Sequence, residues 1–204
     1  MKRFVLYIIG VCLACLPMSA QLNRAEAILE RTVTAFQEAG GIKATFTVSF
    51  DGTPISYGSI SLLGEKFVLE VGDTKIWFDG CTQWTYLMSA DEVTISKPTL
   101  AELQSINPYA WLSFYKEGYK VSLTSEDNAC YHIQMDAEAG QQMKSMALAI
   151  KRGANLPLWV SISQQQGGKL EIKIDSYLTK QRFSDNFFVF DAKKYPSAEQ
   201  IDLR

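Results

Sequence analysis

Histidine is almost absent from this chain of 204 residues, in which His132 is the only one. Zinc sites and most acid–base mechanisms bring several histidine, cysteine or carboxylate side chains together. Three catalytic motifs are also missing: the nucleophile elbow, the glycine-rich phosphate loop and His-Glu-x-x-His. Glu92 and Glu102 have the residue types of a glycoside-hydrolase pair, but such pairs are common and nothing else in the sequence supports this one. We therefore expect no catalytic residues, no metal and no cofactor.

Long apolar runs are scarce, and residues 4–16 form the one that stands out. This run is too short to span a bilayer, which takes about 20 residues. Lys2 and Arg3 precede it and small residues follow it, which is typical of a secretory signal peptide. Cys15 weakly resembles the lipidated cysteine of a lipoprotein signal, although Cys12 stands where an aliphatic residue is usual. We predict a signal peptide over residues 1–20 and one exported domain over residues 21–204.

Neither sign of charge is in large excess. The net charge is −2, and removing the signal peptide, with two basic residues and no acidic ones, makes it −4. No cluster of lysine and arginine stands out along the sequence, which argues against nucleic acid and anionic membrane surfaces as partners. Of the four cysteines, Cys81 and Cys130 remain after cleavage. In an oxidising compartment they form either a disulfide or two separate thiols, and sequence alone does not decide between them.

Alternation of apolar and polar residues is the dominant pattern from residue 42 onward. Short segments rich in aromatic and β-branched residues, bounded by Gly, Asp or Ser, predict about six consecutive antiparallel strands before residue 96. Further segments follow at residues 119–123, 130–135, 143–151, 156–162 and 170–177, with an aromatic run at 187–190 and a mostly polar tail. About eleven strands are too many for a flat sheet, so we expect a mainly β fold, a single unclosed antiparallel barrel.

Two segments have helical rather than strand spacing. Residues 25–36 carry an apolar stripe that predicts an amphipathic helix, with Asn23 as its N-cap and Gly40 ending it. The aromatic middle segment, residues 100–115, is broken by Asn107-Pro108 and must bury its apolar side chains against the sheet. It is either ordinary core or a lid over a cavity, and the residues expected in the lid are Leu103, Ile106, Trp111 and Leu112.

Several different short motifs are spread along nearly the whole predicted domain. They are Ala44-Thr45-Phe46 after the first helix, residues 58–62 before Phe67, residues 79–86 with the sequence DGCTQWTY, Asn107-Pro108, and Phe188-Val189-Phe190. In this order they resemble the outer-membrane lipoprotein carrier family, the LolA-like proteins of the bacterial periplasm, and the ending at residues 195–204 resembles its Bacteroidetes-type branch. One departure is that better-studied members carry Arg-Pro before the third strand, where that arginine helps to hold the lid shut. Here residues 64–66 are Gly-Glu-Lys.

The resemblance implies an unclosed β-barrel with a helical lid, located in the periplasm. Its apolar cavity would shield the acyl chains of a lipoprotein between an inner-membrane lipoprotein-release complex and an outer-membrane acceptor. We expect a monomer that binds no nucleic acid. The residues predicted to line the lipid cavity are Phe46, Val48, Ile60, Leu62, Phe67, Leu69, Ile76, Phe78, Trp84, Tyr86, Val93 and Ile95. The alternative is a periplasmic adaptor of the same fold that senses a lipid or lipoprotein.

Overall fold

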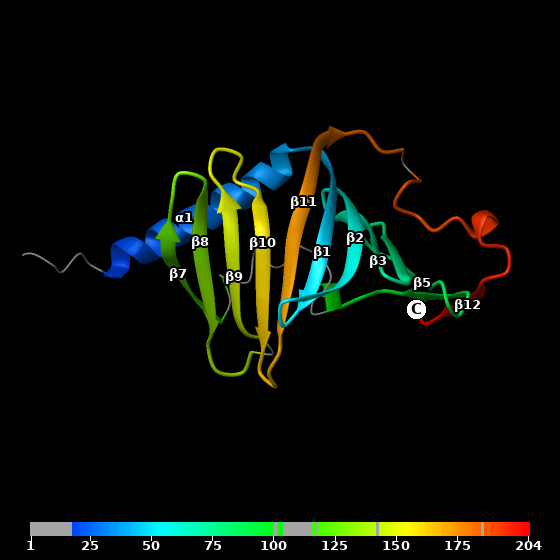
Figure 1. Ribbon diagram of the computed structural model, residues 1–204. Helices are drawn as coiled ribbons and strands as arrows, with labels where there is room; N and C mark the ends of the chain where they lie inside the picture. The colour runs from blue at the N-terminus through cyan, green and yellow to red at the C-terminus, as the bar shows by residue number, and fades with distance from the viewer. Residues whose placement is uncertain (1–17, 100–101, 104–115, 117, 142, 185) are drawn as a thin grey trace, which may run out of the picture.

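The computed structural model describes residues 18–99, 102–103, 116, 118–141, 143–184 and 186–204, with side chains from residue 24 onward. One long helix, a short 3₁₀ helix (η2, Ala192–Lys194) and twelve strands are the main regular elements of these residues (Figure 1). The elements are α1 (Met18–Glu38), β1 (Gly41–Phe50), β2 (Thr53–Leu63), β3 (Lys66–Val71), β4 (Thr74–Phe78), β5 (Gln83–Leu87), β6 (Glu92–Ser96), β7 (Tyr119–Glu126), β8 (Cys130–Ala137), β9 (Met143–Lys151), β10 (Pro157–Gln164), β11 (Lys169–Gln181) and β12 (Glu199–Asp202).

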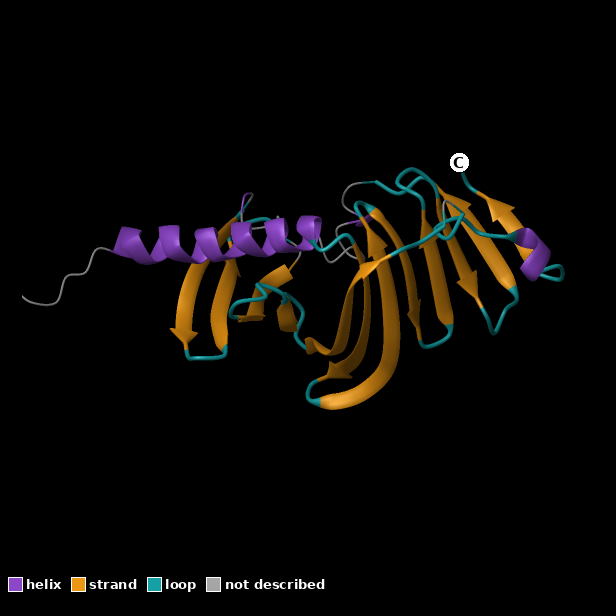
Figure 2. Ribbon diagram, turned by 90° about the horizontal axis from the view of Figure 1, so that it is seen from above, coloured by secondary structure: helices purple, strands orange, loops and turns teal. Residues whose placement is uncertain are grey.

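All twelve strands belong to one sheet, in the order β12-β6-β5-β4-β3-β2-β1-β11-β10-β9-β8-β7. Neighbouring strands are antiparallel except β12, which pairs with β6 in parallel. The two end strands, β12 and β7, do not pair, so the curled sheet stays open (Figure 2). The predicted unclosed β-barrel is therefore confirmed, with one strand more than the eleven expected.

The extra strand lies in the tail, for which the sequence indicated only polar character. β12 extends the edge of β6, with Glu199 opposite Glu92 and Asp202 opposite Ile95. The aromatic run at residues 187–190 forms turns rather than a strand. Parallel pairing of a four-residue tail has no local sequence signal, because it depends on where the preceding loop delivers the chain.

The helix α1 lies across the sheet and covers part of its inner face (Figure 2). Ala25, Ile28, Leu29 and Phe36 point into the core, as the predicted stripe requires, and none of them is more than 3% exposed. Gly40 follows with φ of +66°, a conformation that suits glycine and ends the helix. The start was predicted wrongly: α1 already includes Met18, so its backbone does not begin at an Asn23 cap.

Two apolar clusters lie on the two faces of the sheet. The inner cluster joins α1 to β1–β4 and β7–β11 and includes Phe46, Phe67 and Phe78. The outer cluster consists of Val68, Trp77, Val93, Ile95, Phe188 and Phe190. On β3 and β4 successive side chains alternate between the two clusters, as period-two geometry requires. The segment that follows β11 covers this part of the outer face, which is why strands β3 and β4 are buried on both sides.

No helix among the described residues is both long and apolar enough to cross a membrane.

Candidate functional site

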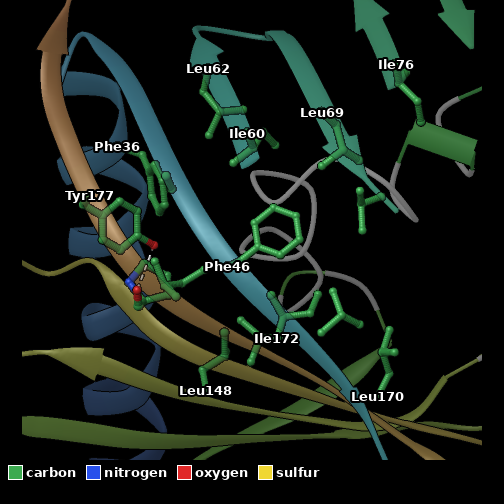
Figure 3. A pocket seen from close by; sticks show the side chains of 16 residues that line it. Phe36, Phe46, Ile60, Leu62, Leu69, Ile76, Leu148, Leu170, Ile172 and Tyr177 are labelled. Carbon is green, nitrogen blue, oxygen red and sulfur yellow. Dashed lines mark hydrogen bonds between the residues drawn. The ribbon is translucent and has the colours of Figure 1, made fainter. Parts of the chain in front are cut away.

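The inner face of the sheet encloses a cavity of about 310 Å³ beside α1 (Figure 3). Sixteen residues of α1, β1–β4 and β9–β11 line it: Phe36, Ala44, Phe46, Val48, Ile60, Leu62, Leu69, Val71, Ile76, Leu148, Pro157, Val160, Leu170, Ile172, Ile174 and Tyr177. All of these side chains are apolar apart from the hydroxyl of Tyr177. Such a lining offers a ligand dispersion contacts and removal from water, and it offers no charged partner.

The one polar side chain in the lining is satisfied within the protein. The Tyr177 hydroxyl donates a hydrogen bond to the backbone carbonyl of Pro157 at 2.8 Å. Burial raises the pKa of this phenol well above its usual value of 10, so it stays neutral. The ring therefore adds apolar wall to the cavity, while its oxygen is already occupied.

The position of Phe46 depends on a glycine in the neighbouring strand. Phe46 of β1 lies opposite Gly58 of β2, and its ring occupies the space where a side chain at residue 58 would stand. A Cβ built on Gly58 would also lie 2.7 Å from the backbone oxygen of Glu70. Glycine thus lets the aromatic ring lie flat on β2 and form one side of the cavity.

Six of the twelve residues predicted to form the cavity wall line this cavity: Phe46, Val48, Ile60, Leu62, Leu69 and Ile76. Phe67 and Phe78 share the inner face but pack against one another, with ring centroids 5.4 Å apart. They contribute to the solid core beside the cavity rather than to its lining.

The other four predicted wall residues lie on the wrong face. The strand register places Leu69 opposite Ile76, Ile76 opposite Thr85, and Thr85 opposite Thr94. On β5 and β6 the inner face therefore carries Thr85 and Thr94, and the four predicted residues, which alternate with them, point outward. The residues for which the prediction was wrong are Trp84, Tyr86, Val93 and Ile95. They belong to or pack against the outer cluster. The prediction assumed that the largest side chains of each strand face the cavity. Instead, these side chains lie on the outer face, where the segment that follows β11 covers them.

Ten lining residues were not predicted from the sequence, and most come from the second half of the chain. Leu170, Ile172 and Ile174 alternate along β11, so their common face was readable. Their position beside β1 could not be read from the sequence, because that pairing joins Phe46 to Ile174 across more than a hundred residues. The remaining ones are Phe36, Ala44, Val71, Leu148, Pro157, Val160 and Tyr177.

The predicted lid begins with a capped helical turn. The Thr99 backbone N–H and hydroxyl donate to the Glu102 carboxylate at 2.7 and 2.8 Å, and the Glu102 N–H donates back to the Thr99 hydroxyl at 3.3 Å. These bonds form a capping box and lower the pKa of Glu102. Leu103, one turn on, packs against the inner cluster. The other three lid residues, Ile106, Trp111 and Leu112, lie outside the described residues.

Two further predictions concern residues away from the cavity. Cys81 and Cys130 are free thiols, at the turn after β4 and at the start of β8. Six strands separate β4 from β8 in the sheet, so the disulfide considered from the sequence does not form. Residues 64–66, which the resemblance placed at the position of Arg-Pro, lie exposed at the turn between β2 and β3.

A family model described as "Outer membrane lipoprotein carrier protein LolA" matches residues 17–166. No curated protein matches the sequence significantly. Among solved structures, an uncharacterized conserved protein from Thermus thermophilus is similar, with a TM-score of 0.63 and 14% identity over 88% of this chain and 99% of that one. At this identity the likeness concerns the fold alone.

Two further solved structures are more distant. A putative outer membrane lipoprotein-sorting protein domain from Vibrio parahaemolyticus has a TM-score of 0.48 and 10% identity, covering 82% of this chain and 97% of that one. The lipoprotein LppX from Mycobacterium tuberculosis has a TM-score of 0.48 and 13% identity, covering 79% and 98%. The family model matches well over half of the sequence, so the chain belongs to the LolA family of outer membrane lipoprotein carrier proteins.

Proposed function

We propose that this protein is an exported periplasmic carrier that holds an acyl chain of a lipoprotein in the inner cavity and ferries it from the inner to the outer membrane. The observation that carries the proposal is the chemistry of the lining. Fifteen of its sixteen side chains are hydrocarbon, and the polar atom of the remaining one is hydrogen-bonded internally. A ligand matched to this surface is itself a hydrocarbon.

The size of the cavity sets the amount of hydrocarbon that it accepts. A cavity of about 150 Å³ lined by aliphatic residues holds benzene, so about 310 Å³ corresponds to roughly a dozen carbon atoms. At about 0.8 kcal/mol per buried methylene, that length of chain contributes roughly 10 kcal/mol before the costs of ordering. Such a ligand leaves for water slowly. Loading and unloading therefore require direct transfer, which in this proposal involves an inner-membrane release complex and an outer-membrane acceptor.

The direct test replaces a cavity residue with a charged one. Leu69 lines the cavity, and Leu69→Glu would place a carboxylate where no partner can satisfy it. Leu63→Glu is the matched control, because Leu63 is 39% exposed and lies outside the lining. We expect Leu69→Glu to lose binding of a triacylated lipoprotein in a pull-down while the control retains it. If a folded Leu69→Glu protein still binds the lipoprotein, the cavity is not the binding site for the acyl chain.

Two further measurements, one on the purified protein and one in the cell, complete the test. Native mass spectrometry of the protein purified from its own envelope is expected to show a bound acylated molecule. Depletion of the protein is expected to leave outer-membrane lipoproteins at the inner membrane. If depletion leaves lipoprotein sorting unchanged while the acylated molecule is still bound, the carrier role is wrong and the adaptor role replaces it.

A further inference from the structure

A second hollow lies on the outer face of the sheet, on the opposite side of β3 and β4 from the cavity. Its volume is about 680 Å³. It is bounded by the outward side chains of these two strands and by the segment that follows β11. The lining residues used below are Lys75, Trp77, Phe190, Lys193, Lys194 and Tyr195.

Three aromatic rings form one side of this hollow. The ring centroid of Trp77 lies 5.4 Å from that of Phe190 and 5.7 Å from that of Tyr195, and the last two rings stack at 5.3 Å. Trp77 is only 7% exposed, so the tail holds this wall in a fixed place. Aromatic packing of this kind joins residues 190–195 to β4 and shapes the hollow.

Three lysines border the same hollow. Lys75 Nζ lies 5.3 Å from the centroid of the Trp77 ring and 3.0 Å from Glu70 Oε2. Lys194 Nζ lies 3.8 Å from Asp191 Oδ2, and its side chain is 75% exposed, so that pair is weak. Lys193 has no ion-pair partner within the described part of the chain. Asp191 is the only acidic residue in the lining. With Glu70, which pairs with Lys75 from beside the hollow, the three lysines leave a local net charge of +1 on an acidic protein.

This basic cluster was not visible in the sequence. Lys75 is more than a hundred residues from Lys193 and Lys194, so no run of basic residues in the sequence indicates the cluster. Asp191 holds the two tail lysines at the hollow, because its carboxylate accepts a hydrogen bond from the Lys193 backbone N–H at 3.1 Å and starts a 3₁₀ helix over Ala192–Lys194.

We propose that this hollow is a binding site for the head group of an anionic phospholipid, through which the protein docks reversibly on a bilayer surface. The lysines supply charge complementarity to the phosphate. The half-buried Tyr195 ring, apolar with a polar edge, suits the interface between head groups and acyl chains, and the buried Trp77 ring packs behind it. An acidic peptide would use the charges but gain little from the aromatic wall. The proposal does not depend on the acyl-chain cavity, which lies on the other face.

Vesicle co-sedimentation tests the site. The purified full-length protein is mixed with phosphatidylcholine vesicles that contain either no phosphatidylglycerol or about 30% of it, at low salt. We expect binding to the anionic vesicles only. A lysine near an anionic surface contributes about fivefold in affinity, so Lys193→Gln with Lys194→Gln is expected to weaken binding roughly 25-fold. Both lysines are exposed, and an unchanged melting temperature checks that the variant folds.

Matched controls separate this site from general charge and from the cavity. Lys120→Gln with Lys173→Gln removes the same charge from exposed positions outside the hollow and is expected to leave vesicle binding almost unchanged. Leu69→Glu alters the cavity and should also bind anionic vesicles normally. Equal losses in both lysine pairs, equal binding to neutral vesicles, or full competition by an oligo-glutamate peptide would each overturn the proposal.

Discussion

Filling the cavity without introducing a charge tests whether it is truly empty space. Ala44 of β1 lines the cavity and is 4% exposed. Ala44→Leu adds three carbon atoms to a surface that is already apolar. In a solidly packed core, the same change forces neighbouring side chains apart and costs about 1–3 kcal/mol. The sign of the stability change therefore distinguishes a hollow from a core.

The expected gain follows from the buried carbon. At about 0.8 kcal/mol per methylene, three carbons add at most about 2 kcal/mol to the free energy of unfolding. For a protein of this size that corresponds to a rise in melting temperature of about 4–8 °C. The filled space is also lost to the ligand, so the affinity for an acylated peptide is expected to fall by about 2 kcal/mol, or roughly 30-fold.

The assay is thermal unfolding by circular dichroism together with fluorescence titration of an acylated peptide. Ala25→Leu is the matched control, because Ala25 is fully buried in the inner cluster and does not line the cavity. We expect this control to lower the melting temperature. If Ala44→Leu lowers it as much as Ala25→Leu does, residue 44 faces filled space and our reasoning about the cavity fails.

Two further predictions concern other parts of the sheet. Gly58→Ala is expected to push the Phe46 ring into the cavity and lower stability by about 1–3 kcal/mol, measured by the denaturation midpoint in urea, because no space exists for the new methyl group. An unchanged midpoint would show that the ring yields freely. At the end of β12, hydrogen bonds from the Arg204 guanidinium and backbone N–H lower the pKa of Asp202 from 3.8 to about 2. A lowered pKa means that the pair stabilises the tail fully above about pH 4 and loses this effect as the pH falls through 2. Loss of the Arg204 side-chain N–H signal in NMR spectra should follow that titration, and Asp202→Asn should abolish the pH dependence.

Local patterns in the sequence were sufficient for the type of each main element. Alternating residues such as Ala44, Phe46 and Val48 predicted β1, and two of the glycines that bound the predicted strand segments, Gly72 and Gly80, lie at turns with positive φ. The stripe of α1 predicted its buried face. These features follow from the periods of strands and helices, which operate over a few residues.

The faces of β5 and β6 needed information from beyond these strands. An alternating strand shows that Trp84 and Tyr86 share a side, but not whether that side faces the cavity. The aromatic residues of the segment that follows β11 cover Trp84 and Tyr86 on the outer face, where the Tyr86 and Tyr195 ring centroids lie 4.7 Å apart. Only the folded chain brings a partner from residue 195 onto this strand.

Thus the sequence by itself determined strands β1–β11, their turns, the apolar face of α1 and the absence of a recognisable catalytic motif. The tertiary structure alone decided which apolar residues enclose a cavity and which lie on the outer face. It also decided that Lys75 joins two lysines of the tail, and that Cys81 and Cys130 lie too far apart in the sheet to pair. The physical reason is that period and turn chemistry act locally, whereas cavities and charge clusters arise from strand order, register and the path of the tail.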